Sequence, residues 1–109
     1  MMIALIRKHF VFDETNYPEL AGRGEGERLA FALRHVAIHC AKTTGKIATV
    51  SEAADHGEAV DKEGLEVDCA KALINTLRLA DLIGLSGKDL ERIIGEVYGE
   101  QEGEALTEN

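Results

Sequence analysis

The stretch LAFALRHVAIHCAKTTGKIATVSEAA, residues 29–54, decides the fold of this chain. Two rows of mostly apolar residues run through it, each with a seven-residue repeat and offset from the other by four. The first row contains Leu29, Val36, Thr43 and Val50, and the second contains Leu33, Cys40, Ile47 and Ala54. Rows with this spacing share one side of an α-helix. The stretch therefore predicts one long helix over residues 27–54, with an apolar seam that packs against another helix.

A stripe of polar side chains runs beside this seam. It contains Arg28, His35, His39, Lys42, Lys46 and Thr49. Positive and protonatable groups on one helix face can bind phosphate oxygens. We therefore take the five residues other than the threonine as candidate ligand-binding residues. The alternative is an exposed basic ridge that pairs with acids of a neighbouring helix or of a partner. The i, i+4 spacing of His35 and His39 is also that of two metal ligands on a helix.

The other segments predict a small all-α protein. Residues 65–83 are apolar on more than one side and indicate a helix between two neighbours, with Gly84 as its C-terminal cap. Ser86 begins a third helix, with Asp89 in a variant of the capping box. Residues 2–12 fit either a short helix or an edge strand. We expect residues 27–54 and 65–83 to form an antiparallel hairpin, with the third helix packed across it.

At 109 residues the chain is expected to be a single domain. Residues 1–26 would form an N-terminal arm and loop, residues 27–98 the helical core, and residues 99–109 a frayed acidic tail. A helical protein of this size often completes its core by pairing. We expect two copies to join, through the second helix and the seam of the first, into a four-helix-type bundle.

The composition limits the choice of partners and location. The net charge of −8 argues against nucleic-acid binding, which needs a basic face. No segment approaches the roughly 20 apolar residues of a membrane span. The two cysteines, Cys40 and Cys69, stand among apolar residues and are expected to be buried free thiols. Together these features predict a cytoplasmic protein with no membrane partner.

Two segments resemble the all-α nucleoside triphosphate pyrophosphohydrolases of the MazG-like group. HVAIHCAKTTGKIATVSEAADHG, residues 35–57, is similar to the first catalytic helix of that family, and EVDCAKALINTLRLADLIGLSGKDL, residues 66–90, to the second. The stretches around Leu79-Ala80-Asp81 and Gly84-Leu85-Ser86 match best. The resemblance implies a helical fold, dimerisation and a nucleotide site. In that site four carboxylates hold Mg²⁺, and the metal neutralises the phosphates and activates water.

The chain departs from this family at the metal-binding positions. Thr43, Lys46, Asp68 and Lys71 stand where the family carries its four acids. Only Asp68 keeps a carboxylate, and the lysines would repel a divalent cation. One arrangement would restore a Mg²⁺ site. Glu52 and Asp55, spaced i and i+3 at the end of the first long helix, could bind the metal together with Asp68.

Three functions remain open at this point. The first is a divergent MazG-like protein that binds a nucleotide or another phosphorylated small molecule, with little or no hydrolysis. The second is a Mg²⁺-dependent pyrophosphohydrolase that uses Glu52, Asp55 and Asp68. The third is a non-catalytic helical oligomer that acts as a protein-interaction module. The sequence identifies no catalytic residue.

Overall fold

The computed structural model describes residues 2–108, and the side chains of residues 2–99. Its elements follow the order α1 (Met2–His9), η1 (Pro18–Leu20), α2 (Glu25–Asp55), α3 (Lys62–Leu82) and α4 (Gly87–Glu108), where η1 is a 3-10 helix. No strand occurs among these residues, so the predicted all-α class is confirmed. Within the same range, no helix has both the length and the apolar character needed to cross a bilayer.

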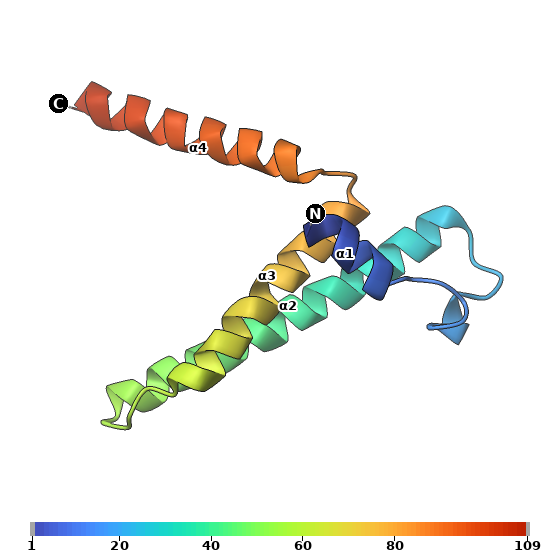
Figure 1. The fold of residues 1–109 in the computed structure, drawn as a ribbon, viewed down its shortest axis with the longest axis horizontal. Helices are drawn as coiled ribbons and strands as arrows, with labels where there is room; N and C mark the ends of the chain where they lie inside the picture. Colours follow the sequence, from blue (N-terminus) through green and yellow to red (C-terminus); the bar gives the residue numbers. More distant parts are fainter. Residues whose placement is uncertain (1, 109) are drawn as a thin grey trace.

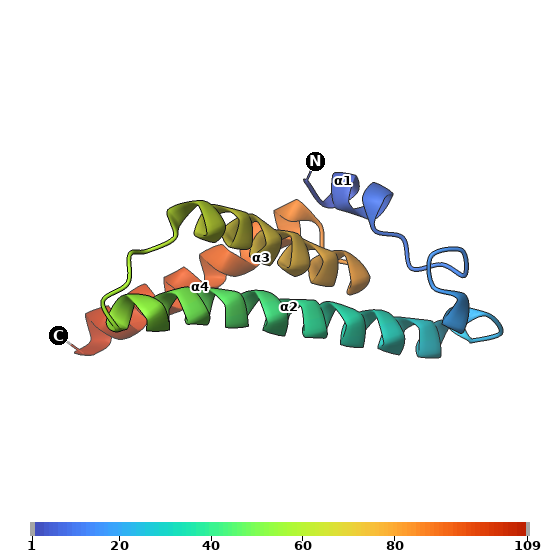
Figure 2. The same cartoon turned by 90° about the horizontal axis from the view of Figure 1, so that it is seen from below.

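Helices α2 and α3 form the predicted antiparallel hairpin (Figure 1). Val36 and Thr43, from the first of the two rows, are buried. Leu29 of the same row is 42% exposed, because α2 extends beyond the end of α3 (Figure 2). Asp61 caps the N-terminus of α3 by accepting a 3.0 Å hydrogen bond from the Gly64 backbone N–H.

The N-terminal segment is a helix and not an edge strand. α1 packs on α3, and its two buried residues, Ile3 and Ile6, form a cluster with Leu77 and Ala80 of α3. Leu85 and Leu90, on either side of the start of α4, pack against the same cluster. The first helix thus covers part of α3 near its C-terminal end.

Helix α4 differs from the prediction in two ways. It does not lie across the hairpin but extends away from it beyond its first turn (Figure 1). It also continues to Glu108, past Gly99, where a frayed tail was expected. The start of the helix agrees with the prediction, since Ser86 and Asp89 form a reciprocal capping box with N···O distances of 2.8 and 3.1 Å.

Two smaller expectations about side chains also need correction. Both cysteines are free thiols, but Cys69 is exposed and Cys40 only half-buried. The apolar neighbours of Cys69 in the sequence therefore do not place it in the core.

Candidate functional site

A pocket of about 400 Å³ lies between α2 and α3, a size in the range of small-molecule sites. Most of its polar lining is cationic. The lining residues are Phe10, His39, Lys42, Thr43, Lys46, Lys71, Ile74, Asn75 and Arg78. Among the described side chains, no Asp or Glu contributes to this lining. The pocket therefore concentrates positive charge on a chain whose net charge is −8.

Helix α2 supplies three of the predicted binding residues. His39, Lys42 and Lys46 follow each other at helical spacing, so their side chains leave α2 on one face. All three line the pocket, with His39 half-buried and the lysines exposed. The structure thus brings together the middle part of the basic stripe at the contact between the two helices.

Helix α3 supplies the opposite wall through Lys71, Asn75 and Arg78. The buried Asn75 side chain donates a 3.4 Å hydrogen bond to Thr43 Oγ1 of α2, which sets the level at which the two helices face each other. Lys71 and Arg78 were not predicted as binding residues. Their spacing of i and i+7 places them on one helix face, but only the pairing with α2 shows that this face meets the basic stripe.

Arg78 has an unusual environment for an arginine. It is only 7% exposed, and its Nε atom has no hydrogen-bond partner among the described residues. Its guanidinium lies over the rings of Phe10 and Phe12, with Cζ 4.6 and 5.2 Å from the ring centroids. These cation–π contacts offset only part of the cost of burying the charge.

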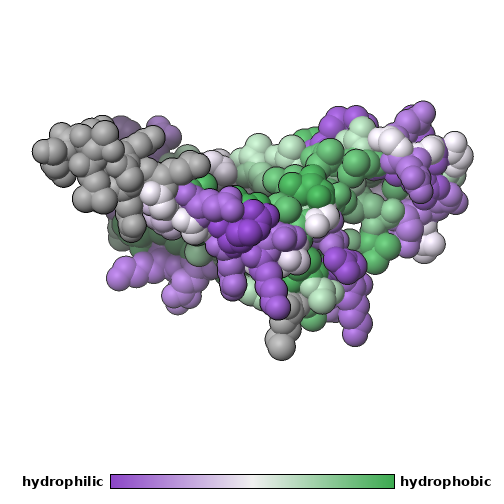
Figure 3. Space-filling view, turned by 90° about the horizontal axis from the view of Figure 1, so that it is seen from above, coloured by the Kyte–Doolittle hydropathy of each residue, from purple (hydrophilic) through white to green (hydrophobic). Residues whose placement is uncertain are grey.

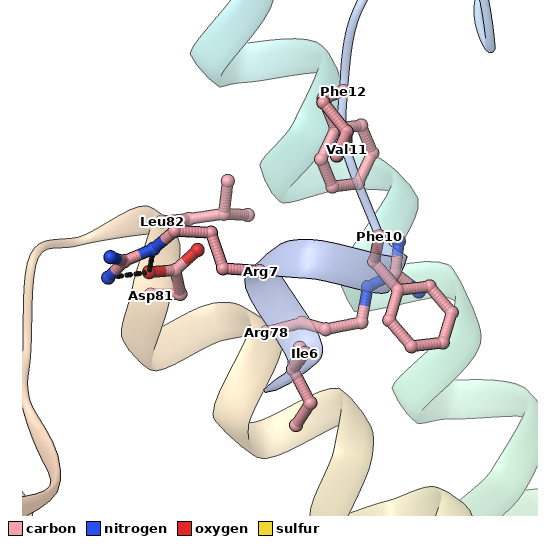
Figure 4. Close-up of a pocket in the computed structure, with 8 residues that line it drawn as sticks. All are labelled: Ile6, Arg7, Phe10, Val11, Phe12, Arg78, Asp81 and Leu82. Carbon is pink, nitrogen blue, oxygen red and sulfur yellow. Dashed lines mark hydrogen bonds and ion pairs between the residues drawn. The ribbon is translucent and has the colours of Figure 1, made fainter. Parts of the chain in front are cut away.

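The nearest acid in sequence does not neutralise Arg78. Asp81, one turn further along α3, accepts from Arg7 of α1 instead, with an Nη2–Oδ1 distance of 2.6 Å. Figure 4 shows this pair beside the Arg78 side chain, which extends toward Phe10. The residues drawn in Figure 4 line a second pocket, of about 230 Å³, and Arg78 is one of them. Its charge therefore remains unpaired by any described carboxylate.

His35 does not line the cationic pocket, but it contacts His39, which does. Its ring packs against Phe12, Tyr17 and Phe31. His35 Nε2 lies 3.1 Å from His39 Nε2, so one of these two nitrogens carries no proton. Burial lowers the pKa of His35, the nearby His39 and Arg78 charges lower it further, and Glu19 opposes them. His35 thus orients the pocket residue His39.

Arg28 is separate from the pocket. Its guanidinium donates to the Glu14 carboxylate and, over 3.0 Å, to the Arg23 carbonyl oxygen. These contacts hold the loop before α2. They give the Arg28 guanidinium hydrogen-bond partners without a ligand. The structure therefore does not bring Arg28 into the pocket that His39, Lys42 and Lys46 line.

The predicted metal ligands do not assemble. Among the described residues, no three His, Cys, Asp or Glu side chains come together in a way that could hold a metal ion. Glu52 and Asp55 are exposed at the end of α2, whereas Asp68 is buried on α3. The spacing of Glu52 and Asp55 was compatible with a shared site, but it could not show where Asp68 would lie.

Comparisons with protein families, with curated proteins and with solved structures found no match for this chain. The assignment of a function therefore depends on the geometry and charge of the pocket.

Proposed function

We propose that this protein binds a nucleotide or another phosphorylated small molecule in the pocket between α2 and α3, without hydrolysing it. The observation that carries the proposal is the buried Arg78, whose charge no described carboxylate neutralises, in a pocket that three lysines share. A phosphate group would supply the missing negative charge. Arg is suited to this role because its planar guanidinium can donate two parallel hydrogen bonds to phosphate oxygens.

The remaining lining residues fit the same ligand class. Lys42, Lys46 and Lys71 are exposed, so they can move toward a bound phosphate and add charge from the rim. Thr43 and Asn75, both buried, offer neutral polar groups beside them. A local positive field on an acidic protein also concentrates small anions at the pocket.

The resemblance to MazG-like pyrophosphohydrolases supports the location of this site. Three of the four positions that carry acids in that family are Thr43, Lys46 and Lys71 in this chain, and all three line the pocket. We propose that a site which binds phosphates through Mg²⁺ in the family binds them here through lysines and arginine. Such a substitution retains phosphate binding but removes the metal that activates water.

We place this function in the cytoplasm. Both cysteines are free, and Cys69 is exposed, which suits a reducing compartment.

The experiment is a thermal-shift titration of the protein with pyrophosphate, nucleoside triphosphates and sugar phosphates. We expect at least one of them to raise the Tm in a concentration-dependent way, because a ligand that binds only the folded state stabilises it. Lys46→Gln and Lys71→Gln should each weaken the apparent affinity about tenfold, since a hydrogen bond to a charged group contributes about 1.5 kcal/mol or more.

Lys88→Gln is the matched control, because Lys88 is an exposed lysine at the start of α4 and does not line the pocket. It should bind the ligand as the unaltered protein does. The absence of a Tm change with every phosphate compound would contradict the proposal. Release of pyrophosphate from a nucleoside triphosphate with Mg²⁺ would show that the non-hydrolytic part is wrong.

A further inference from the structure

The isolated chain is too extended to be a complete folding unit. Its radius of gyration is 18.0 Å, whereas a compact domain of this length has about 13 Å. Its accessible surface is 8240 Å², whereas a compact monomer of 11.8 kDa has about 5,900 Å². The surplus of roughly 2,300 Å² per chain, about 4,600 Å² for two chains, lies in the range of total surface that obligate dimers bury.

The surplus includes two apolar surfaces on different elements. One is the face of α4 that carries Ile93, Ile94, Val97 and Tyr98, of which the last three are exposed. The other is a groove of about 460 Å³ between α1 and α3. Its lining residues are Met2, Leu5, Ile6, His9, Phe10, Leu73, Ile74 and Leu77. Figure 3 views the α1 and α4 side of the molecule and shows hydrophobic side chains gathered in the middle of this face.

The α4 helix cannot reach the groove of its own chain without losing contacts that fix its direction. The Ser86–Asp89 capping box orients the first turn, and Leu85 and Leu90 anchor that turn on the cluster formed by α1 and α3. From this anchor α4 leads away from the hairpin (Figure 1). Its apolar face is therefore directed toward a surface outside its own chain.

We infer that α4 of one copy docks its Ile94–Tyr98 face into the α1–α3 groove of a second copy, and that the second copy does the same in return. This exchange is a closed two-fold contact, in which each chain contributes the same two surfaces. It covers both of the apolar surfaces described above in each chain. It also differs from the dimer expected from the sequence, which joined two copies through the second long helix and the seam of the first. The inference is independent of the proposed ligand.

A disulfide cross-link tests the exchange. The variant combines Leu5→Cys and Ile94→Cys with Cys40→Ser and Cys69→Ser. We expect oxidation to give a covalent dimer on a non-reducing gel, and light scattering to give the mass of two chains before oxidation. Arg92→Cys in place of Ile94→Cys is the matched control, because Arg92 lies on the other side of α4, and it should not cross-link.

Three results would overturn the inference: a cross-link within one chain, a mass of one chain, or a two-chain mass with no Leu5–Ile94 cross-link. A second variant gives an independent measurement. Ile94→Glu with Val97→Glu should lower the mass twofold at unchanged helical content, whereas Arg92→Gln should leave the mass unchanged.

Discussion

At the scale of single residues, Arg78 determines what the pocket can bind. Most buried arginines pair with a carboxylate, and here Arg7 occupies the acid that is nearest in sequence, Asp81. The contacts with Phe10 and Phe12 stabilise the guanidinium but do not neutralise it. A buried charge held in this way reduces stability in the absence of an anion and increases affinity in its presence. This combination is typical of binding sites, where function and stability conflict.

Replacing Arg78 should therefore stabilise the protein. We expect Arg78→Met to raise the free energy of unfolding by about 1 kcal/mol, because the relief of an unsatisfied buried group of about 1–3 kcal/mol exceeds the lost cation–π contacts. Urea denaturation followed by circular dichroism measures this change. A loss of several kcal/mol would show instead that Arg78 is a structural residue.

His35 should make stability depend on pH. Its pKa is lowered in the folded protein, first by burial and then by the His39 and Arg78 charges. The unfolded chain consequently binds more protons than the folded chain below the ordinary histidine pKa of about 6.5. The free energy of unfolding should fall as the pH decreases from 7.5 to 5.5.

The variant His35→Phe should flatten this pH dependence, because it keeps the aromatic packing but cannot bind a proton. His56→Gln is the control, since His56 is exposed at the end of α2. If the unaltered protein has the same free energy of unfolding at pH 7.5 and at pH 5.5, the account of His35 is wrong.

At the scale of elements, the sequence predicted α2, α3 and their antiparallel pairing well, and the N-terminal helix and the course of α4 poorly. The seven-residue rows repeat over four turns or more, and so strong a pattern defines both the helix and its buried face. Residues 2–12 are too few for periodicity to separate helix from strand. In α3 apolar residues surround the helix, so the sequence could not show that Lys71 and Arg78 face α2.

The sequence predicted only the part of the pocket that a single helix supplies. His39, Lys42 and Lys46 belong to one helix, and their shared face follows from spacing alone. The role of Arg78 depends on contacts between residues far apart in the sequence, with Phe10 and Phe12 on one side and the Arg7–Asp81 pair on the other. Arg28 shares the stripe of α2, but it lies about three turns before His39 and pairs with a loop residue, Glu14.

Gly45 allows a test at the level of helix α2. A Cβ atom at this position would meet no described atom within 4 Å, so no neighbouring backbone approaches it closely. Gly45→Ala should therefore raise the free energy of unfolding by about 1 kcal/mol, the difference in helix propensity between the two residues. Thermal or urea denaturation measures it.

Gly64→Ala is the contrasting variant in α3. A Cβ atom at residue 64 would collide with the Asp61 carboxylate that caps the helix. This substitution should lower stability, by about the 1 kcal/mol that an N-cap contributes. Equal effects of the two glycine substitutions would contradict the packing described for α2 and α3.

At the scale of the whole molecule, charge is divided between the surface and the pocket. The chain carries a net charge of −8, yet the described side chains around the pocket include four permanent positive charges and no acid. Such a protein repels polyanions over most of its surface and attracts a small anion at one place. The affinity for a phosphorylated ligand should accordingly fall as salt screens the attraction.

Isothermal titration calorimetry with pyrophosphate and a nucleoside triphosphate is the most direct test of the central claim, that an unpaired Arg78 and its neighbouring lysines form a phosphate site. The account predicts one site per chain, an affinity that decreases between 50 and 500 mM NaCl by about tenfold or more, and loss of binding in Arg78→Met. Binding that is unchanged in Arg78→Met, or no binding of any phosphate compound to the unaltered protein, would contradict it.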